Sequence, residues 1–422
     1  MRHMVPDYLQ EMLEAHAGER GGELADYIPE LAAADPDPFG VAIAMIDGQV
    51  HAAGDALAPF TIQSISKPFV YALALADAGF EEVLRRIDVE PSGNAFNELS
   101  LKPGSGRAYN PMINAGALTA HSLVSGADAQ ERSERIRELL GELAGRELEV
   151  DETVFASEFE VAHRNLGIAH MLRAAGTVEE DPESVVRGYT RQCSVLVTVQ
   201  DLAMMAATLA NGGVQPVSGR RLMAPAVVRQ VLSVMMSCGM YDAAGDWITN
   251  VGIPAKSGVA GGLIGALPGQ LGLAAFSPRL DEHGNTVRGV RIFERLSRDM
   301  SLHVMENAEP ARSVMRAARL LRRPDGGREV VVELQGTIRF AGAERIVRAC
   351  TADLPRGLVT LDCTRVFSID RVARTMLYEL ARRLRLDGHE VRFLAAGAEL
   401  FPDAPEGPEA PRIELREEPG EH

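Results

Sequence analysis

The chain has 422 residues, of which 46% are hydrophobic and 24% are charged, and its net charge is −16. The length predicts two or three domains, the composition excludes wholesale disorder, and the acidity disfavours nucleic acids and membrane surfaces as partners. The four cysteines, Cys193, Cys238, Cys350 and Cys363, are too sparse for a disulfide framework. Residues 1–7 lack the pattern of an export signal, so a cytoplasmic location is expected.

In chain order, the first 321 residues predict strands near both ends and helices between them. Residues 1–35 have helical spacing, residues 40–46 form a strand-like run, and the turn at Asp47-Gly48 leads into a second strand. Strand-like composition returns over residues 251–276 and 287–293. Helices are expected over residues 60–78, 130–144, 157–175, 198–210 and 298–321. This order predicts an α+β fold with early and late strands in one sheet.

Two segments of this part allow more than one interpretation. Residues 257–276 carry no charge, and a segment of this length could span a membrane. However, it is interrupted by six glycines, Pro268 and Gln270. Strands joined by tight turns are therefore expected there. Arg132 to Arg137, with Glu131 and Glu134, are predicted to form a solvent-exposed helix face.

The last quarter of the chain differs in character. Residues 322–328 contain a proline, paired glycines and charges, and are predicted to be a linker. Residues 329–405 alternate strands and helices, which predicts a small α/β domain. Its strands are expected over residues 330–334, 357–362 and 390–395, and its helices over 340–353 and 371–386, with a helix start at 397–401. The Pro/Glu-rich residues 406–422 are predicted to be a flexible tail.

The clearest chemical motif is Gln63-Ser64-Ile65-Ser66-Lys67, at the start of the apolar helix expected over 60–78. Ser64 and Lys67 are three residues apart, so they share one helix face. A lysine whose pKa is lowered by burial can take the proton of a serine hydroxyl and make it a nucleophile. Lysine is rare in this chain: there are three, against forty arginines, which cannot act as bases.

A second lysine stands in Lys256-Ser257-Gly258. This tripeptide is similar to the Lys-Thr/Ser-Gly element that accompanies Ser-x-x-Lys in the serine β-lactamases and penicillin-binding proteins. In that fold the element lies on an edge strand beside the nucleophile. A backbone N–H there can form an oxyanion hole with that of the serine.

Several dispersed polar residues complete the candidate set. Asn114 stands among small apolar residues, and Glu158 and Asn165 are seven apart on one predicted helix, which places them on one face. Tyr189 and Tyr241 each offer a phenol. Taken singly, each of these residues is better explained as a helix cap or a satisfied core group.

Taken together, these segments resemble the serine-dependent glutaminases of the β-lactamase-like fold over residues 24–300. The matching segments are 24–31, 63–67, 90–93, 110–117, 157–165, 189–194, 201–213, 238–241 and 256–262. The resemblance implies a β-lactamase/penicillin-binding-protein-like sheet with a helical subdomain. It implies hydrolysis of L-glutamine to L-glutamate and ammonia through a Ser-Lys acyl-enzyme, without cofactor or metal, in a dimer or tetramer.

The resemblance also assigns roles to residues. Ser64 matches the nucleophile and Lys67 its base, and either Tyr241 or Tyr189 is expected to relay the proton to the leaving amine. The substrate contacts are expected at Tyr27, Gln63, Ser64, Asn114, Glu158, Asn165, Tyr189, Tyr241 and Val259. Glu158 suits the α-ammonium of glutamine, and the asparagine and tyrosine donors suit its α-carboxylate. The backbone N–H groups of Ser64 and Val259 are expected to hold the oxyanion.

The C-terminal unit, residues 328–401, resembles a STAS domain. The matching segments are 332–336, 340–341, 361–370 and 388–391, and Arg371 stands where that family usually places a phosphorylatable serine or threonine after the aspartate. A binding or assembly role with a protein partner is expected. Two alternatives to the glutaminase remain: another serine acyl-hydrolase of the same fold, and a non-enzymatic STAS-linked regulator.

Overall fold

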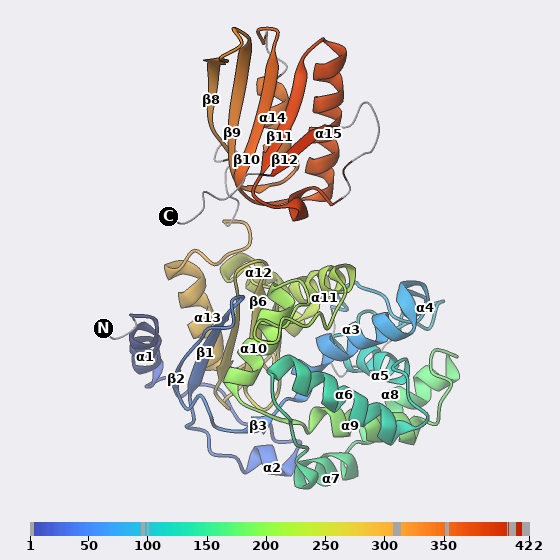
Figure 1. The fold of residues 1–422 in the computed structure, drawn as a ribbon. Coiled ribbons are helices and arrows are strands. Elements are labelled where there is room, and N and C mark those ends of the chain that lie inside the picture. The colour runs from blue at the N-terminus through green and yellow to red at the C-terminus, as the bar shows by residue number, and fades with distance from the viewer. Residues whose placement is uncertain are drawn as a thin grey trace. The chain divides into compact units, whose positions relative to one another are not determined.

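A computed structural model describes residues 4–93, 98, 101–306, 314–350, 354–402, 404 and 411–415. The chain divides into two compact units, Met1–Asn307 and Ala308–His422. The buried side chains of the two units form separate hydrophobic cores, and each unit is described by itself (Figure 1).

The first unit is built on a five-stranded sheet in the order β2-β1-β7-β6-β5, with every neighbouring pair antiparallel. The strands are β1 Gly40–Met45, β2 Val50–Gly54, β5 Ala255–Ser257, β6 Gly262–Leu267 and β7 Leu271–Phe276. The strands predicted over residues 40–46, after Asp47-Gly48 and within 251–276 are therefore confirmed. Among the described residues, no helix combines the length and apolarity that crossing a membrane requires.

The sheet is buried on both faces, and side-chain size differs between them. Val41 and Ile43 of β1 pack with α1 (Met4–His16) and α13 (Val287–Asp299), whereas Ala42 and Ala44 face α10 (Val199–Ala210). Helix α10 lies so close to the sheet that a Cβ on Gly272 would stand 2.2 Å from the backbone nitrogen of Ala207. Small residues on that face thus bring the helical part of the unit against the sheet.

The helical part of the first unit lies beside this sheet (Figure 1). Its helices are α2 Pro29–Ala32, α3 Lys67–Asp77, α4 Gly79–Arg86, α5 Asn114–Ser122, α6 Ala129–Ala144, α7 Glu152–Glu160, α8 His163–Ala174, α9 Pro182–Cys193, α11 Pro225–Cys238 and α12 Ala244–Asn250. A two-stranded ladder of β3 (Phe60–Thr61) and β4 (Leu196–Val197) joins the segment before Ser64 to the segment after α9.

Three predictions for this unit are wrong in part, and a fourth, the strand over residues 287–293, is wrong throughout. The segment 60–78 begins with β3 and a 3-10 turn, η1 (Gln63–Ser66), before α3 begins. The segment 157–175 is divided between α7 and α8, and 1–35 contains only α1 and the short α2. Residues 287–293, predicted as a strand, lie in α13, because Thr286 caps that helix and Gly289, Ile292, Phe293 and Leu296 share its buried face.

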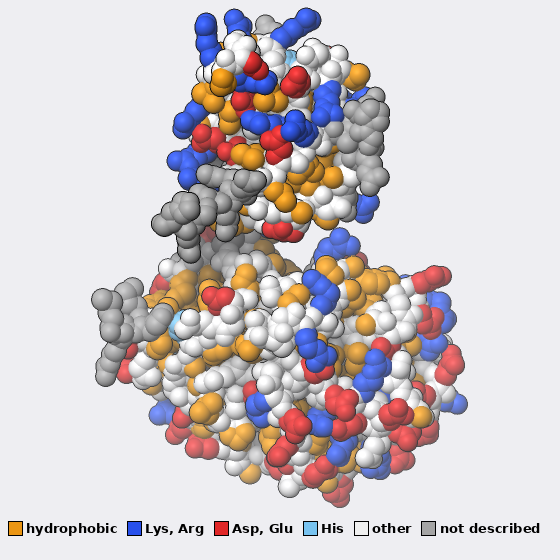
Figure 2. Space-filling view, in the orientation of Figure 1, with side chains coloured by type: hydrophobic (Ala, Val, Ile, Leu, Met, Phe, Trp, Pro, Cys, Tyr) orange, Lys and Arg blue, Asp and Glu red, His pale blue; other side chains and the backbone are white. Residues whose placement is uncertain are grey.

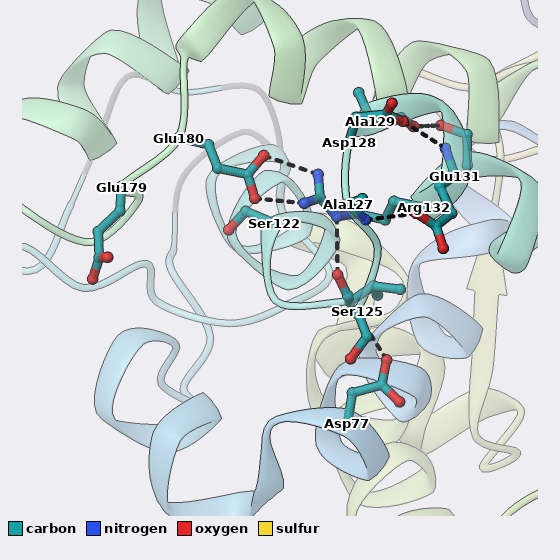
Figure 3. Close-up of polar contacts among 12 residues, drawn as sticks. Asp77, Ser122, Ser125, Ala127, Asp128, Ala129, Glu131, Arg132, Glu179 and Glu180 are labelled. Carbon is teal, nitrogen blue, oxygen red and sulfur yellow. Dashed lines mark hydrogen bonds and ion pairs between the residues drawn. The ribbon is translucent and has the colours of Figure 1, made fainter.

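The helix face predicted to be solvent-exposed at Arg132–Arg137 is also only partly so. Arg132 is 3% exposed, and its guanidinium donates to both carboxylate oxygens of Glu180 (Figure 3). Its Nε also donates to the carbonyl of Val124. Asp128 caps the first turn of α6 by accepting from the backbone N–H groups of residues 130 and 131. Arg132 therefore holds the loop before α6 to the loop before α9.

The second unit is a mixed sheet in the order β12-β11-β10-β9-β8, in which only the β8–β9 pair is antiparallel. Its elements are β8 Met315–Arg322, β9 Arg328–Ile338, α14 Phe340–Cys350, β10 Leu358–Ile369, α15 Arg371–Leu386, β11 Glu390–Ala395, the 3-10 turn Ala398–Leu400 and β12 Arg412–Leu415. In β9, Val330, Val332 and Leu334 are buried, and the alternate residues carry ion pairs such as Glu329–Arg392.

Four boundary predictions in or beside this unit fail wholly or in part. A helix was predicted over 298–321, but Met315–Arg322 is a strand paired with β9, and residues 307–313 lie outside the described part. Residues 323–327, predicted as linker, form the turn between β8 and β9, closed by the N–H of Arg323 and the carbonyl of Gly327. The first domain accordingly ends near residue 307 rather than 321. In the segment 406–422, predicted to be flexible, Arg412–Leu415 forms edge strand β12 and the other residues, Pro411 excepted, lie outside the described part.

Candidate active site

The turn that carries Ser64 has a strained backbone. Gln63, the residue before it, has φ 49°, a left-handed conformation that non-glycine residues rarely adopt. Such conformations persist where the surrounding structure imposes them, often at functional sites. Here β3 fixes the chain before the turn, and α3, with Pro68 in its first turn, fixes the chain after it.

Lys67 lies beneath this turn with 1% of its surface exposed. Its Nζ donates to the carbonyl of Met112 at 3.2 Å and to Oδ1 of Asn114 at 2.7 Å. Burial lowers the pKa of Lys67 from 10.5 to about 8, because the charged form loses its hydration. A substantial fraction of this amine is therefore neutral at mildly alkaline pH.

A cavity of about 250 Å³ opens above Ser64. It gathers most of the predicted substrate contacts from distant parts of the chain. Its walls are Tyr27, Ile28, Gln63, Ser64, Asn114, Glu158, Val161, Ala162, Arg164, Asn165, Tyr189 and Val259. Eight of these lining residues are predicted substrate contacts, and they come from separate helices and loops. Lys67 lies below the floor of the cavity.

Glu158 and Asn165 meet in the cavity although they belong to different helices. Glu158 is near the end of α7, Asn165 is in the first turn of α8, and the break between them replaces the continuous helix that was predicted. Gln63 Nε2 donates to Glu158 Oε2 at 3.1 Å, and Asn114 Nδ2 donates to Asn165 Oδ1 at 2.9 Å. Burial raises the pKa of Glu158 to about 7, and the hydrogen bond from Gln63 and the charge of Lys67 oppose this shift only in part.

Tyr241 stands on the other side of Ser64. It has φ 54°, and its hydroxyl donates to the carbonyl of Ser257 at 3.2 Å and is hydrogen-bonded to Ser64. Burial raises the pKa of Tyr241 to about 12, and these two hydrogen bonds oppose that shift. The Nζ of Lys256 lies 3.9 Å from the centre of the Tyr241 ring, and burial lowers the pKa of Lys256 well below its usual value.

A second cavity, of about 330 Å³, shares Tyr27 and Val259 with the first and includes Tyr241. Tyr27 is 49% exposed, so it forms part of the rim of both cavities. Tyr189 is buried on α9, and burial raises its pKa well above 10. Burial also raises the pKa of the nearby Cys193 thiol to about 12, which keeps this thiol protonated and unreactive.

The comparisons with known proteins agree with this arrangement. The family model described as glutaminase matches residues 22–305. A glutaminase of Corynebacterium glutamicum is 49% identical over 402 residues, covering 94% of this chain and 96% of its own. The chain belongs to the glutaminase family. It is therefore an amidohydrolase with glutaminase activity, as the sequence predicted.

Solved glutaminase-related structures share the fold. The crystal structure named Mglu is 51% identical, with a TM-score of 0.86, covering 93% of this chain and 98% of its own. A probable glutaminase from Bacillus subtilis, solved in complex with 6-diazo-5-oxo-L-norleucine, is 32% identical, with a TM-score of 0.67 over 72% of this chain and 98% of its own.

The glutaminase site also contains groups that the sequence did not single out. The carbonyl of Met112 binds Lys67, and Arg164 lines the cavity beside Asn165. A backbone carbonyl has no signature in a sequence, and Arg164 is one of forty arginines. Within the described ranges, no group of three or more His, Cys, Asp or Glu side chains is placed to hold a metal ion.

Proposed function

We propose that the chain hydrolyses L-glutamine to L-glutamate and ammonia through an acyl-enzyme on Ser64, with Lys67 as the base. The observation that carries this proposal is the environment of Lys67. A neutral amine has two N–H donors and one lone pair, and here two acceptors, Met112 and Asn114, take the donors. We assign the lone pair of the neutral amine to the hydroxyl of Ser64, which stands three residues before Lys67 in the chain.

In the first step, Ser64 Oγ attacks the side-chain carbonyl carbon of glutamine while its proton passes to Lys67 Nζ. The oxyanion that forms is held by the backbone N–H groups of Ser64 and Val259, which both line the cavity. The C–N bond then breaks, and the nitrogen takes a proton and leaves as ammonia. The ammonium of Lys67 supplies this proton, through the hydroxyl of Tyr241, which is hydrogen-bonded to Ser64.

In the second step, water attacks the γ-glutamyl ester. Lys67, neutral again, accepts the proton of the water, and the ester oxygen leaves as the Ser64 hydroxyl with a proton returned along the same route. We assign the relay to Tyr241 rather than Tyr189, because Tyr241 has the hydrogen bond to Ser64.

The substrate is oriented by charge. Glu158, already fixed by Gln63, binds the α-ammonium, and that cation favours the ionised form of a carboxyl group otherwise half-protonated near pH 7. Asn165, Asn114 and Tyr27 offer donors to the α-carboxylate. Support for an amino-acid ligand comes from related structures: one described as Mglu in its tris and glutamate form is 45% identical, with a TM-score of 0.87.

The proposal is tested by ammonia release from L-glutamine and by mass spectrometry after incubation with 6-diazo-5-oxo-L-norleucine. We expect Ser64→Ala to lose turnover and labelling, and the wild type to carry the label on the peptide that contains Ser64. Ser194→Ala retains Ser64, removes a buried hydroxyl outside the cavity, and serves as the matched serine control for labelling. Wild-type turnover by the Ser64→Ala variant would contradict the assignment of the nucleophile.

We propose further that the first unit has the β-lactamase-like fold and that the second unit has the STAS fold. The second unit would then bind a protein partner rather than catalyse a reaction. The antiparallel sheet beside the Ser64 turn and the second unit's parallel β9-β10-β11-β12 order support this. Asp370 caps α15 and Arg371 follows it, so no hydroxyl for phosphorylation stands at that point. The dimer or tetramer and the cytoplasmic location stay predictions.

A further inference from the structure

A chain of buried polar side chains lies behind the Ser64 turn, and the reaction steps above do not use it. His121 Nδ1 lies 2.9 Å from Gln192 Oε1, Gln192 Nε2 donates to Ser66 Oγ at 3.0 Å, and Ser66 Oγ donates to the carbonyl of Gln63 at 2.8 Å. The first three side chains are at most 1% exposed. Buried polar groups are costly unless they are paired, so this chain is held together strongly.

The direction of every hydrogen bond in the chain is determined. The carbonyl of Gln63 can only accept, so Ser66 must donate to it and must accept from the amide nitrogen of Gln192. The amide oxygen of Gln192 then accepts from His121, whose proton is therefore on Nδ1. Burial lowers the pKa of His121 to about 3, which keeps the ring neutral. Its Nε2 has no hydrogen-bond partner among the described residues and faces Gly188, where a Cβ would stand 2.3 Å away.

The chain joins the elements that carry the site. His121 is on α5, which begins with Asn114, and Gln192 is on α9, one turn after Tyr189. Ser66 is on η1 with Ser64. The chain ends on the peptide group between Gln63 and Ser64. Because a trans peptide is planar, fixing its carbonyl on one side also fixes the N–H of Ser64 on the opposite side.

We propose that His121, Gln192 and Ser66 are positioning residues that orient and polarise the peptide N–H of Ser64 as an oxyanion donor. This inference rests on the acyl-enzyme proposed above. The hydrogen bond accepted by the Gln63 carbonyl draws electron density from the peptide and strengthens its N–H as a donor. It also holds Gln63 in its left-handed conformation. The three side chains contribute to the transition state without lining the cavity that binds the substrate.

The first test compares two buried serines. Ser66→Ala removes the hydroxyl that binds the Gln63 carbonyl, whereas Ser194→Ala removes an equally buried hydroxyl that donates to the carbonyl of Thr190 at 2.9 Å. We expect Ser66→Ala to lower kcat by about 10- to 100-fold with KM changed by less than about twofold, since loss of a whole oxyanion donor costs about 100- to 1000-fold. Ser194→Ala should leave kcat unchanged while lowering the thermal midpoint similarly.

The second test uses His121 and separates positioning from packing. Asparagine can place an amide N–H where His121 has Nδ1–H, whereas leucine cannot donate. We expect His121→Leu to lower kcat by about tenfold or more, and His121→Asn to recover most of that loss, with KM unchanged in both. Equal kcat values for the two variants, at equal thermal midpoints, would overturn the inference.

Failure of the positioning role can be distinguished from failure of the proposed acyl-enzyme mechanism. If Ser64→Ala retains turnover, the acyl-enzyme itself is wrong. If Ser64→Ala is inactive but Ser66→Ala loses no more kcat than Ser194→Ala, only the positioning role fails. A loss confined to KM in the Ser66 and His121 variants would also overturn it, because a substrate-binding defect is not the effect of an oxyanion donor.

Discussion

At the scale of single residues, burial moves the pKa values of an amine and a carboxyl group toward each other. The pKa of Lys67 falls to about 8 and that of Glu158 rises to about 7, and in both the largest cause is desolvation. Such opposed shifts prepare one group to accept a proton and the other to gain its charge when a cationic ligand arrives. The apolar sequence around Lys67 led us to expect the lowered pKa of its amine, whereas the raised pKa of Glu158 was not predicted, because it depends on what surrounds that carboxyl group after folding.

These pKa values predict the acid side of the pH profile. The fraction of neutral Lys67 rises as pH increases through about 8, and the fraction of ionised Glu158 rises through about 7. We therefore expect kcat/KM to rise with pH in two steps and to level off about one pH unit above the pKa of Lys67. Glu158→Gln should remove the lower step and move the upper one to lower pH, because the carboxylate raises the pKa of Lys67.

The measurement is kcat/KM for ammonia release from acidic to alkaline pH, with wild type and Glu158→Gln at equal ionic strength. Asn165→Asp, which adds a carboxyl group beside Glu158 in the same cavity, is a control that should move the upper step to higher pH. An upper step that stays in place in both variants would show that Lys67 is not the group that titrates.

Lys67→Arg tests the requirement for a neutral amine. Arginine keeps the charge and can donate to Met112 and Asn114, but it does not give up its proton. We expect kcat to fall by about 100-fold or more, the usual contribution of general base catalysis, with measurable binding of L-glutamate by calorimetry retained. Turnover within about tenfold of wild type would contradict the role of Lys67 as base.

At the scale of elements, local pattern predicted the sheet well and helix boundaries less well. The strands of the first unit were predicted from local patterns, namely the turn at Asp47-Gly48 and the glycine-interrupted apolar run after Lys256. Met315–Arg322 is rich in alanine, leucine and arginine, which favour helices. Its pairing with β9 through the Pro-Gly turn overrides that propensity. The break between α7 and α8 has no glycine or proline to mark it.

Most of the predicted site residues line one cavity, yet the chain of His121, Gln192 and Ser66 was not predicted. Ser64 and Lys67 were predicted because their spacing places them on one helix face, within an apolar segment of a chain that has few lysines. Gln192 and Ser66 are 126 positions apart, so only the packing of α9 against η1 brings them together.

Helix α5 gives a prediction at this scale, because its first turn packs tightly against the loop that holds Lys67. A Cβ on Gly116 would stand 1.9 Å from the carbonyl oxygen of Asn110. We expect Gly116→Ala to displace the start of α5, with Asn114, and to lower both kcat and the free energy of unfolding, the latter by about 1–3 kcal/mol.

Gly245→Ala is the matched control for this change. Gly245 is also helical, on α12, and nothing lies within 4 Å of its Cβ position. Alanine there should raise the free energy of unfolding by about 0.5–1 kcal/mol and leave kcat unchanged. Denaturant unfolding and steady-state kinetics measure both quantities. Equal effects at the two positions would show that contact with Asn110 does not constrain α5.

At the scale of the whole molecule, the two units differ in charge as well as in core. Residues 308–422 contain as many acidic as basic side chains, so the net charge of −16 belongs to residues 1–307. On the visible face of the first unit, acidic and basic side chains are mixed over the helices rather than separated (Figure 2). The acidic excess therefore acts as a diffuse self-repulsion, which salt reduces by screening.

This asymmetry predicts that salt stabilises the units unequally. Because each unit has its own core, calorimetry should resolve two unfolding transitions. Variants that lack a helix cap in one unit then show which transition belongs to that unit. Asp181→Ala removes the cap of α9 in the first unit, and Asp370→Ala that of α15 in the second; each should lower only its own transition, by about 1 kcal/mol.

With the transitions assigned, adding salt from low to physiological ionic strength should raise the midpoint of the first unit and change that of the second little. The reason is that screening relieves repulsion only where like charges are in excess, and in the balanced unit it weakens attractive pairs such as Glu329–Arg392 as well. An equal rise of both midpoints would mean that salt acts through apolar burial, which is common to both cores, rather than through the acidic excess of residues 1–307.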